Sequence, residues 1–318
     1  MLSRLFRNLS LLAGVVVCLL PLGSSAQSTA CPGTDTTALS WLDKMSRSMH
    51  QVSYHGVVTL QRGDDMQVMQ VSHQVDGGTS ADSLTQLTGQ GAQIKRGSHP
   101  LDCMHPGHQL LRVADDLQAG RCGIAEQYRF SVADGERIAG RRSVSIRIEP
   151  RDMYRFGYAM SLDRETGLLL KTEMIGRGSK VLERFQFANL SYSGQLPGAT
   201  EVDIIHEAEH PHPASRSTES SLGRAWVVRW LPRGFAATDL PSEQSRRRTY
   251  TDGLAVFSVF LEDLEREIRP GEGLVRNGGT TSYTRGMRLT DQPVLVTVIG
   301  EVPVNTARMV ADSVGWMQ

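Results

Sequence analysis

The chain has 318 residues, with 34 lysine and arginine residues balanced by 34 aspartate and glutamate residues. This neutral balance excludes a strongly basic protein that binds nucleic acid as a polyelectrolyte. The length favours two domains over a single hydrophobic core.

Residues 1–26 have the pattern of a secretory signal peptide. Arg4 and Arg7 form its basic start, Leu9 to Leu22 its apolar core, and Ser24 to Ala26 a cleavage site of small residues. The apolar stretch is shorter than the about 20 residues that a membrane helix needs, so an uncleaved anchor is the less favoured alternative. Cleavage removes two arginines and no acidic residue, which leaves 32 basic against 34 acidic residues in an exported, soluble protein.

The four cysteines bear on the redox compartment. Cys18 leaves with the signal peptide, and Cys31, Cys103 and Cys122 remain as an odd number that cannot pair fully within one chain. We expect a disulfide between Cys103 and Cys122, which an oxidising compartment permits. Closing a loop of about 20 residues would contribute roughly 3 kcal/mol. Three unpaired thiols are the alternative, and no two cysteines have the spacing of zinc ligands.

The first part of the mature chain reads as one helix followed by strands. Residues 34–49 are predicted to form an amphipathic helix capped by Thr34 or Asp35, because Leu39, Leu42, Met45 and Met49 recur at helical spacing. The strands expected next are 54–60, 66–71, 144–148, 158–162, 168–175 and 181–187, with turns at 63–64, 134–135, 163–167 and 176–178. This order predicts an α+β fold with a large curved antiparallel sheet.

Residues 208–222 are polar and interrupted by proline, and they are predicted to be a linker between a first domain, 31–207, and a second domain, 223–318. In the second domain we expect strands at 226–231, 254–262, 280–288 and 294–299. A closing helix is predicted to begin near Pro303, with Ala307, Val310 and Val314 on one face.

The sequence contains no recognisable catalytic motif, whether a nucleophile elbow, a zinc-protease helix or a phosphate-binding loop. His206, His210 and His212 cluster around the start of the predicted linker, but no set of ligands completes a metal geometry around them. We interpret them as solvated histidines. We therefore predict a protein that is not an enzyme and has no cofactor or metal.

A helix packed on a curved sheet leaves a concave face that can hold acyl chains. Methionines are adaptable enough to line such a face. The candidate lipid-binding residues are Met66, Met69, Arg142, Met153, Met160 and Met174. Arginines at 141–142 and 151–155 could meet lipid phosphates. Ordinary core packing of the methionines and solvated arginines are the alternatives.

A basic triplet, Arg246-Arg247-Arg248, directly precedes a predicted strand that begins at Tyr250. An exposed strand edge beside cations is a plausible contact for an incoming protein segment, although a solvated loop is the alternative. Phe257 and Phe260 lie three positions apart, so on a strand they face opposite sides. One of the two is expected in the core. The candidate partner-binding residues are Arg246, Arg247, Arg248, Tyr250, Phe257 and Phe260.

Several segments together resemble the MucB/RseB family of periplasmic negative regulators of an extracytoplasmic-function sigma factor. They are Trp41-Leu-x-x-Met45, Tyr54-x-Gly56, Tyr154-Arg-Phe-Gly-Tyr158, Leu162-Asp-Arg-Glu-Thr-Gly-Leu168, Val181-Leu-Glu-Arg-Phe-Gln-Phe187, Leu231-Pro-x-Gly-Phe235, Tyr250-Thr-Asp-Gly253 and Gly300-Glu-Val-Pro303. The stretch from Cys103 to Cys122 departs from the family pattern, which leaves its local structure open.

The resemblance implies a large N-terminal domain similar to the lipoprotein carriers LolA and LolB, an unclosed β-barrel with helices, and a small C-terminal domain. It implies that the C-terminal domain binds the periplasmic part of a membrane-spanning anti-sigma factor of the MucA/RseA kind. Binding would protect that factor from regulated proteolysis, and lipopolysaccharide or mislocalised lipoprotein would release it. The resemblance also implies a homo-oligomer.

Two other classes of function compete with this one. A lipid or lipoprotein carrier of the LolA/LolB type would share the curved sheet but would not need residues 223–318. An envelope hydrolase would need a nucleophile assembled in space, which the sequence does not indicate.

Overall fold

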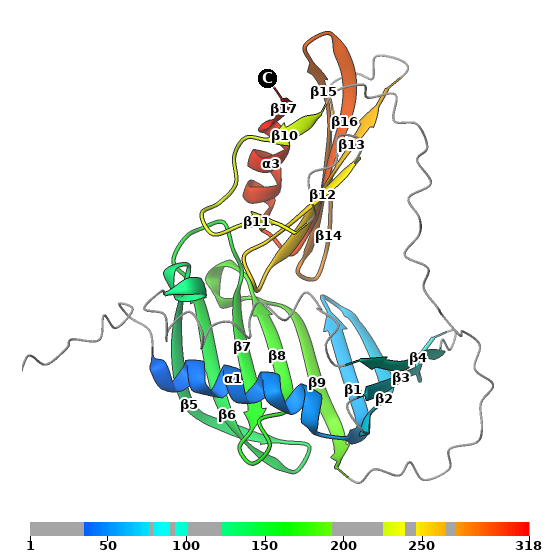
Figure 1. Cartoon of the computed structure of the whole chain (residues 1–318), viewed down its shortest axis with the longest axis vertical. Helices are drawn as coiled ribbons and strands as arrows, with labels where there is room; N and C mark the ends of the chain where they lie inside the picture. Colours follow the sequence, from blue (N-terminus) through cyan, green and yellow to red (C-terminus); the bar gives the residue numbers. More distant parts are fainter. Residues whose placement is uncertain are drawn as a thin grey trace, which may run out of the picture. The chain divides into compact units, whose positions relative to one another are not determined.

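The N-terminal helix of the computed structural model is α1 (Thr36–Gln51), drawn in Figure 1. The structure describes residues 35–76, 79–89, 93–100, 122–192, 225–238, 246–264 and 271–317. Asp35 caps α1, because its Oδ1 accepts a hydrogen bond from the Thr37 amide at 2.8 Å. Leu39, Leu42 and Met45 form its buried face. The predicted helix is confirmed, and Asp35 is its cap.

The strands after α1 form one nine-stranded antiparallel sheet in the order β4-β3-β2-β1-β9-β8-β7-β6-β5. They are β1 (Tyr54–Arg62), β2 (Asp65–Asp76), β3 (Thr79–Gln86), β4 (Gln93–Pro100), β5 (Tyr128–Ile138), β6 (Arg141–Pro150), β7 (Gly157–Asp163), β8 (Leu169–Ile175) and β9 (Val181–Ser191). The short helices η2 (Gly123–Glu126) and η3 (Arg177–Ser179) connect strands. With β4 and β5 at its two edges the sheet is unclosed, as expected for the predicted α+β fold.

The core of this sheet lies between its strands and α1, which Figure 1 shows crossing one face. The predicted alternation in β6 is confirmed, since Val144, Ile146 and Ile148 are 4%, 0% and 0% exposed. Burying each such side chain contributes about 1.5–3 kcal/mol. The apolar face of α1 and the inward positions of β6 therefore account for much of the stability of this layer.

The turn predicted at Asp134-Gly135 is wrong, because β5 continues through both residues. The chain reverses at Ala139 and Gly140, whose φ values of 46° and 77° suit a tight hairpin turn. Gly135 lies where the register between β5 and β6 shifts, and a Cβ there would come within 2.2 Å of Ser143 Oγ. The glycine serves a close cross-strand approach at a bulge rather than a turn.

The C-terminal part contains a six-stranded antiparallel sheet in the order β11-β12-β13-β16-β15-β14 and a separate pair, β10-β17. The elements are β10 (Trp226–Val228), β11 (Ala236–Ala237), β12 (Arg247–Thr251), β13 (Val256–Asp263), β14 (Glu272–Asn277), β15 (Thr280–Leu289), β16 (Gln292–Gly300), α3 (Val304–Asp312) and β17 (Val314–Trp316). Its own hydrophobic core includes Phe257, Tyr283 and Val298, and Val310 of α3 packs against them.

The closing helix differs from the prediction at its end. Helix α3 begins after Pro303 as expected but stops at Asp312, and Val314 belongs to β17. The reason is tertiary: β17 pairs with β10, so Val314 lies opposite Val228 in a strand. Strand β14 was not predicted, because all its residues are exposed and it lacks the alternation of a half-buried strand.

The two sheets have separate hydrophobic cores, yet Cys31–Gln318 form one compact unit. The predicted signal peptide 1–26 and linker 208–222 lie outside the described residues, and the domain boundaries stay predictions. Among the described residues, no helix combines the length and apolarity of a membrane-crossing helix.

Candidate functional site

A buried ion pair joins the nine-stranded sheet to the six-stranded sheet. Arg155, just before β7, directs its Nε to Asp252 Oδ2 at 2.6 Å, and both side chains are fully buried. The Tyr128 hydroxyl donates to the same carboxylate oxygen at 2.9 Å. Burial, followed by the charge of Asp252, raises the pKa of Tyr128, so this hydroxyl remains a donor.

Asp252 is held in place by the turn that contains it. Its Oδ1 accepts hydrogen bonds from the amides of Leu254 and Ala255 at 3.0 and 2.9 Å, an arrangement that aspartate favours in turns. Oδ2 is thereby left to Arg155 and Tyr128. The turn in the segment Tyr250-Thr-Asp-Gly253 thus fixes the orientation of the buried Asp252 carboxylate.

Each nitrogen of the Arg155 guanidinium has a hydrogen-bond acceptor. Arg155 also pairs with Asp152 and donates to the carbonyl oxygen of Arg233. Its guanidinium lies 4.9 Å from the centre of the Phe235 ring and 5.8 Å from that of Tyr128. A buried arginine with this many partners orients the surrounding segments, and removing one partner is costly.

The start of α3 provides a second connection. Thr306 donates from Oγ1 to the Tyr154 carbonyl oxygen at 2.9 Å, and the Tyr154 ring packs edge-on to Trp230 with centroids 5.2 Å apart. Pro303 precedes the helix. The segments containing Arg155, Phe235, Asp252 and Pro303, which carry much of the family resemblance, therefore meet at this junction.

The tip of the β14–β15 hairpin forms a third connection. A Cβ on Gly279 would lie 2.0 Å from Met174 Sδ, and one on Gly278 would lie 3.1 Å from Glu183 Oε2. Glu183 pairs with Arg62 at 3.2 Å. Two glycines at the tip thus permit an approach to β8 and β9 that side chains would obstruct.

Glu301 is a half-buried carboxylate at the same junction. Burial, followed by the nearby charge of Glu183, raises its pKa, and Arg62 lowers it only in part. Unlike Asp252, Glu301 has no arginine hydrogen-bonded to it in the interactions that the structure describes. Its charge is therefore unfavourable in the folded protein.

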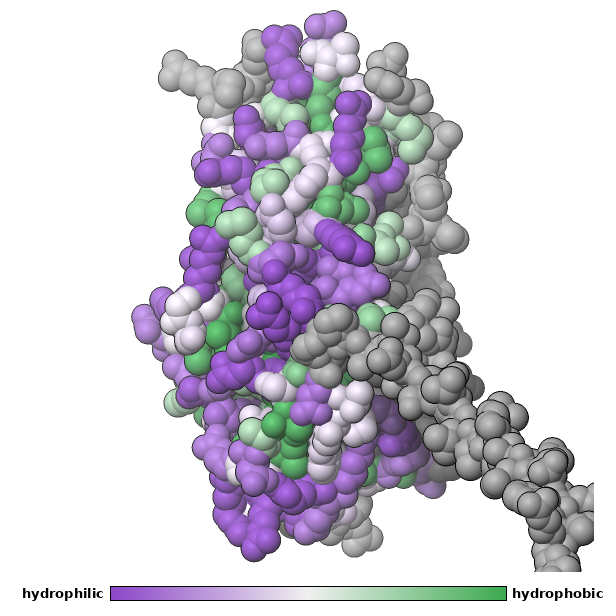
Figure 2. Space-filling view, turned by 90° about the vertical axis from the view of Figure 1, so that its left-hand side faces the viewer, coloured by the Kyte–Doolittle hydropathy of each residue, from purple (hydrophilic) through white to green (hydrophobic). Residues whose placement is uncertain are grey.

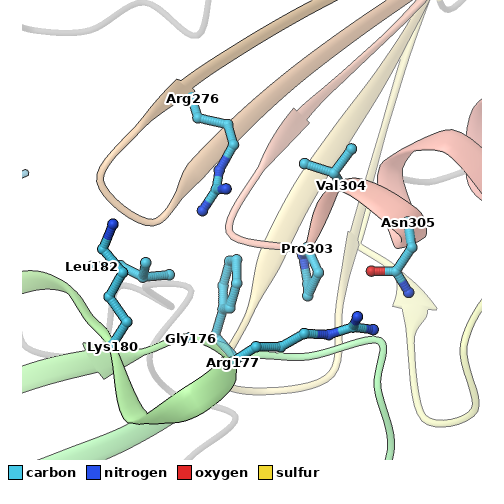
Figure 3. Close-up of a pocket in the computed structure, with 9 residues that line it drawn as sticks. Gly176, Arg177, Lys180, Leu182, Arg276, Pro303, Val304 and Asn305 are labelled. Carbon is cyan, nitrogen blue, oxygen red and sulfur yellow. The ribbon is translucent and has the colours of Figure 1, made fainter.

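A cavity of about 350 Å³ opens beside these contacts (Figure 3). Arg177 and Lys180 lie at the η3 turn, and Arg276 projects toward that turn from β14. Apolar lining comes from Phe156, Leu182, Pro303 and Val304. Among the described residues, three cations and no carboxylate line this cavity, so it suits an anionic group attached to an apolar segment.

The described residues offer no group of three or more histidine, cysteine or acidic side chains that could hold a metal ion. The histidines around the start of the predicted linker, His206, His210 and His212, lie outside the described residues. The junction holds the two sheets together through a buried ion pair, and its cavity can bind an anionic ligand.

The candidate partner-binding residues divide between surface and core. Arg246 and Arg247 are exposed, while Arg248 is half-buried, with its guanidinium 5.0 Å from the centre of the Trp226 ring. Tyr250 and Phe257 are buried and stack with centroids 5.4 Å apart. The expectation that one of the two phenylalanines is in the core is confirmed for Phe257, and the half-buried Phe260 lies on the other face.

The structure brings only two of the candidate lipid-binding residues, Met160 and Met174, into one hydrophobic cluster. Met160 and Met174 are in the core, and Met69 is half-buried. Met66 and Met153 are exposed at 63% and 55%. On the face in Figure 2, hydrophobic side chains appear in small groups between hydrophilic ones. The lipid-binding role of the methionines stays a prediction.

The arginines predicted to flank the concave face have different environments. Arg142 is exposed, as a head-group contact requires. Arg141 instead pairs with Asp163 at 2.7 Å, and Arg155 is buried in the junction. Paired and buried guanidinium groups do not face a lipid phosphate, so the head-group contact stays a prediction only for Arg142 among these three.

Cys122 is disulfide-bonded. Cys103, the partner that we predict for it, lies outside the described residues, as does Cys31. The predicted pairing is therefore untested, while the presence of a disulfide at Cys122 fits the expected oxidising compartment.

Sequence reasoning missed the pairing of Arg155 with Asp252 and the joint placement of Arg177, Lys180 and Arg276. Arg155 and Asp252 both lie inside segments quoted for the resemblance. The available signal for Asp252 was its position directly before Gly253, next to positions expected to be buried. Nothing in the sequence indicates that cations 96 or more positions apart share a cavity.

Comparisons with known proteins add a family to this geometry. The MucB/RseB N-terminal domain matches residues 37–205, and the MucB/RseB C-terminal domain matches residues 220–315. The chain belongs to the MucB/RseB family. The resemblance drawn from short segments is thus confirmed over most of the chain.

One MucB protein and one RseB protein match over nearly their whole lengths. Sigma factor AlgU regulatory protein MucB of Pseudomonas aeruginosa is 31% identical, over 93% of this chain and 96% of its own. Sigma-E factor regulatory protein RseB of Haemophilus influenzae is 26% identical, over 90% and 94%. A crystal structure of MucB in complex with MucA(peri) has a TM-score of 0.68 and 29% identity, covering 87% of this chain and 98% of that one.

Proposed function

We propose that this MucB/RseB family member is a periplasmic regulatory binding protein that restrains an envelope stress response. Its partner is the periplasmic part of a membrane-spanning, MucA/RseA-like anti-sigma factor. The observation that carries the proposal is the match, over 87% of the chain, to a MucB structure that contains MucA(peri). The names of the relatives, regulatory proteins of AlgU and sigma-E, support a role without catalysis.

Two features support the periplasm as the compartment. Residues 1–26 have the signal-peptide pattern, and Cys122 is disulfide-bonded. Disulfides persist in the bacterial periplasm and are rare in the cytosol.

We propose that the bound protein protects the anti-sigma factor from regulated proteolysis and is released by lipopolysaccharide or mislocalised lipoprotein. Release requires that the signal binds the free form better than the complex, because coupling between two ligands is reciprocal. The junction cavity supports such coupling, since a ligand there touches η3, β14 and the start of α3 together.

Within this proposal, Arg177 and Lys180 are the contacts for the anionic head group. Both are exposed and lie beside the apolar Phe156 and Leu182. A phosphate with acyl chains combines the two chemistries that this lining offers. The favoured contacts for the partner protein are the exposed cations Arg246 and Arg247.

Calorimetry with the purified protein and the periplasmic segment of the cognate anti-sigma factor tests the proposal. We expect micromolar or tighter binding that weakens when lipid A-type ligand is added. Absence of binding to the segment, with lipid or lipoprotein still bound, would favour a carrier of the LolA/LolB type.

Charge reversal separates the two candidate head-group sites. Arg177→Glu together with Lys180→Glu is expected to reduce lipid binding by about thirtyfold or more, since each of the two lost phosphate contacts contributes about 1 kcal/mol or more. Arg142→Glu, an exposed arginine on β6, is the matched control. If only Arg142→Glu reduces binding, the head group lies on the β6 side and the cavity proposal fails.

A further inference from the structure

Two carboxylates from different sheets interact at the junction. Glu301 directly follows β16 and is half-buried, and its amide donates to the Val256 carbonyl oxygen at 2.9 Å, which fixes the backbone that carries the carboxylate. Glu183 lies on β9, and its side chain is 21% exposed. Like charges in a partly buried site disfavour each other's ionised form. The docking of the two sheets therefore places a charged Glu301 in an unfavourable position.

The β14–β15 hairpin places Glu301 against β9. Thr281 Oγ1 on β15 donates to the Val302 carbonyl oxygen at 2.6 Å, so the hairpin is connected to the segment that carries Glu301. The tip of the hairpin lies so close to β9 that a Cβ on Gly278 would be 3.1 Å from Glu183 Oε2. Separating the tip from β9 therefore also separates Glu301 from Glu183.

Among the described residues, three side chains of the nine-stranded sheet face Glu301. Glu183 and Arg62 act on it through their charges, and Arg62 Nε is 3.2 Å from Glu183 Oε2. The Tyr158 hydroxyl on β7 is buried and has no hydrogen-bond partner in the part of the chain that the structure describes. Burial, followed by the charge of Glu301, raises the pKa of this hydroxyl, which therefore lies near the carboxylate and stays protonated. One guanidinium thus faces two carboxylates beside an unpaired hydroxyl.

We propose that Glu301 is a proton-controlled contact between the two sheets, which takes up a proton when the sheets dock and releases it when they separate. The proton removes the repulsion between Glu301 and Glu183. It also makes Glu301 a hydrogen-bond donor, with the Glu183 carboxylate and the Tyr158 hydroxyl oxygen as acceptors in its surroundings. Acid therefore strengthens the contact and neutral pH weakens it, because proton binding and docking are coupled reciprocally.

The pKa of Glu301 sets the pH range of this contact. Burial, followed by the charge of Glu183, raises the pKa above the ordinary 4.5 in the docked protein, and Arg62 lowers it in part. When the sheets separate, water reaches the carboxylate and its pKa returns toward the ordinary value. The protonated contact is thus fully present below pH 4.5, and it is lost as pH rises through the raised pKa.

The contact lies beside the junction cavity. Leu182, which lines the cavity, precedes Glu183 in the chain, and Pro303, which also lines it, follows Glu301 by two positions. Opening the contact therefore moves two lining residues that belong to different sheets, and pH regulates a site suited to an anionic ligand. This inference goes beyond the proposed function and does not rest on it, because the contact forms without a partner protein or a lipid.

Hydrogen exchange of the purified protein without ligand tests the proposal, because exchange of an amide follows the opening of the structure around it. Amides of the β14–β15 tip, residues 277–281, are compared between the unaltered protein and Glu301→Gln, whose neutral side chain imitates the protonated acid. The tip sequence is the same in both, so intrinsic exchange rates cancel at each pH. We expect exchange about threefold faster in the unaltered protein at about pH 7.5 and equal rates at about pH 4.5.

Two further variants should move the midpoint of this pH dependence in opposite directions. Glu183→Gln removes the like charge and leaves Arg62 to Glu301, so the midpoint is expected to fall by about half a pH unit or more. Arg62→Gln removes the cation, so the midpoint is expected to rise. Glu262→Gln neutralises an exposed carboxylate of the same six-stranded sheet, and this matched control is expected to change nothing.

Three outcomes would overturn the proposal. A ratio of exchange rates that does not depend on pH would assign Glu301 an ordinary structural role. Opening of the tip that keeps its pH dependence in Glu301→Gln would assign the titration to another group. A midpoint that stays fixed in both Glu183→Gln and Arg62→Gln would exclude the balance of charges as its cause. Thermal unfolding checks that each variant is folded.

Discussion

The same group of three side chains occurs at two places, once within the nine-stranded sheet and once between the two sheets. In the sheet, Arg141 Nε and the Tyr192 hydroxyl contact Asp163 Oδ2 at 2.7 and 2.5 Å. At the junction, Arg155 and Tyr128 contact Asp252 Oδ2 in the same way, at 2.6 and 2.9 Å. In both, the other oxygen of the aspartate accepts amides of its own turn.

The two groups differ in exposure and in sequence separation. Arg141 is 28% exposed and lies 22 positions from Asp163, whereas Arg155 is fully buried and lies 97 positions from Asp252. Solvent can compensate the loss of a partner in the first group but not in the second. The same arginine–tyrosine–aspartate group can therefore stabilise a turn within one sheet or join two sheets. The burial of its arginine determines how much stability is lost when a partner is removed.

The largest expected effect comes from removing the junction carboxylate. Asp252→Ala leaves Arg155 buried without its main partner, and we expect a loss of about 3–5 kcal/mol in the free energy of unfolding. Urea denaturation followed by circular dichroism measures it. Asp252→Asn, which retains the turn hydrogen bonds, is the control and is expected to lose less. A change below about 1 kcal/mol would show that the junction pair is not buried in solution.

The matching substitution in the sheet is expected to cost less. Asp163→Ala removes a buried carboxylate, but the Arg141 guanidinium that loses its partner is 28% exposed to solvent, so the expected loss is about 1–2 kcal/mol. A loss as large as that for Asp252→Ala would break the comparison, because exposure would then not explain the difference.

Lowering the pH should reduce the contribution of Asp163 to the stability of the folded protein. Burial acts to raise its pKa, but hydrogen bonds from Arg141, Tyr192 and the Glu165 amide outweigh burial and lower the pKa below the ordinary 3.8. A depressed pKa contributes stability above the unfolded value, and this contribution is lost as pH falls through the folded pKa. The stability difference between the unaltered protein and Asp163→Asn should therefore shrink below about pH 4.

The tyrosine hydroxyls sharpen the comparison on a smaller scale. Tyr128→Phe removes a fully buried donor, and we expect a loss of about 1–2 kcal/mol. Tyr192→Phe removes a partly buried one, so about 0.5–1 kcal/mol is expected. The two variants are compared by denaturant midpoints at constant slope. Equal losses would indicate that both sites are equally accessible to water.

Substitution of Glu301 is expected to change the free energy of unfolding least, and to increase it rather than reduce it. The pKa of Glu301 is raised in the folded protein above its ordinary value of 4.5. The protonated carboxyl therefore contributes stability that is fully present below pH 4.5, and this contribution is lost as pH rises through the folded pKa. Glu301→Gln is therefore expected to stabilise the protein at pH 7 by less than about 1 kcal/mol. Thermal unfolding at pH 7 and pH 4 checks this, since the difference should disappear at the lower pH.

Local patterns predicted much of the fold. The capped helix after Asp35 and the alternating strand from Val144 to Ile148 were found because their periodicity and capping residues act over a few positions. Asp134-Gly135 misled because the same dipeptide suits a turn and a bulge, and only the opposing Ser143 distinguishes them. Strand β14 gave no signal, since an exposed edge strand has no buried face.

The sequence by itself determined the family, the α+β class and the candidate residues, because these depend on local segments and their order. Tertiary structure alone decided that Arg155 meets Asp252, that Arg177, Lys180 and Arg276 share one cavity, and that Tyr250 and Phe257 are core residues. These facts depend on contacts between segments far apart in the chain. Such contacts follow from how two sheets pack, which short-range periodicity does not encode.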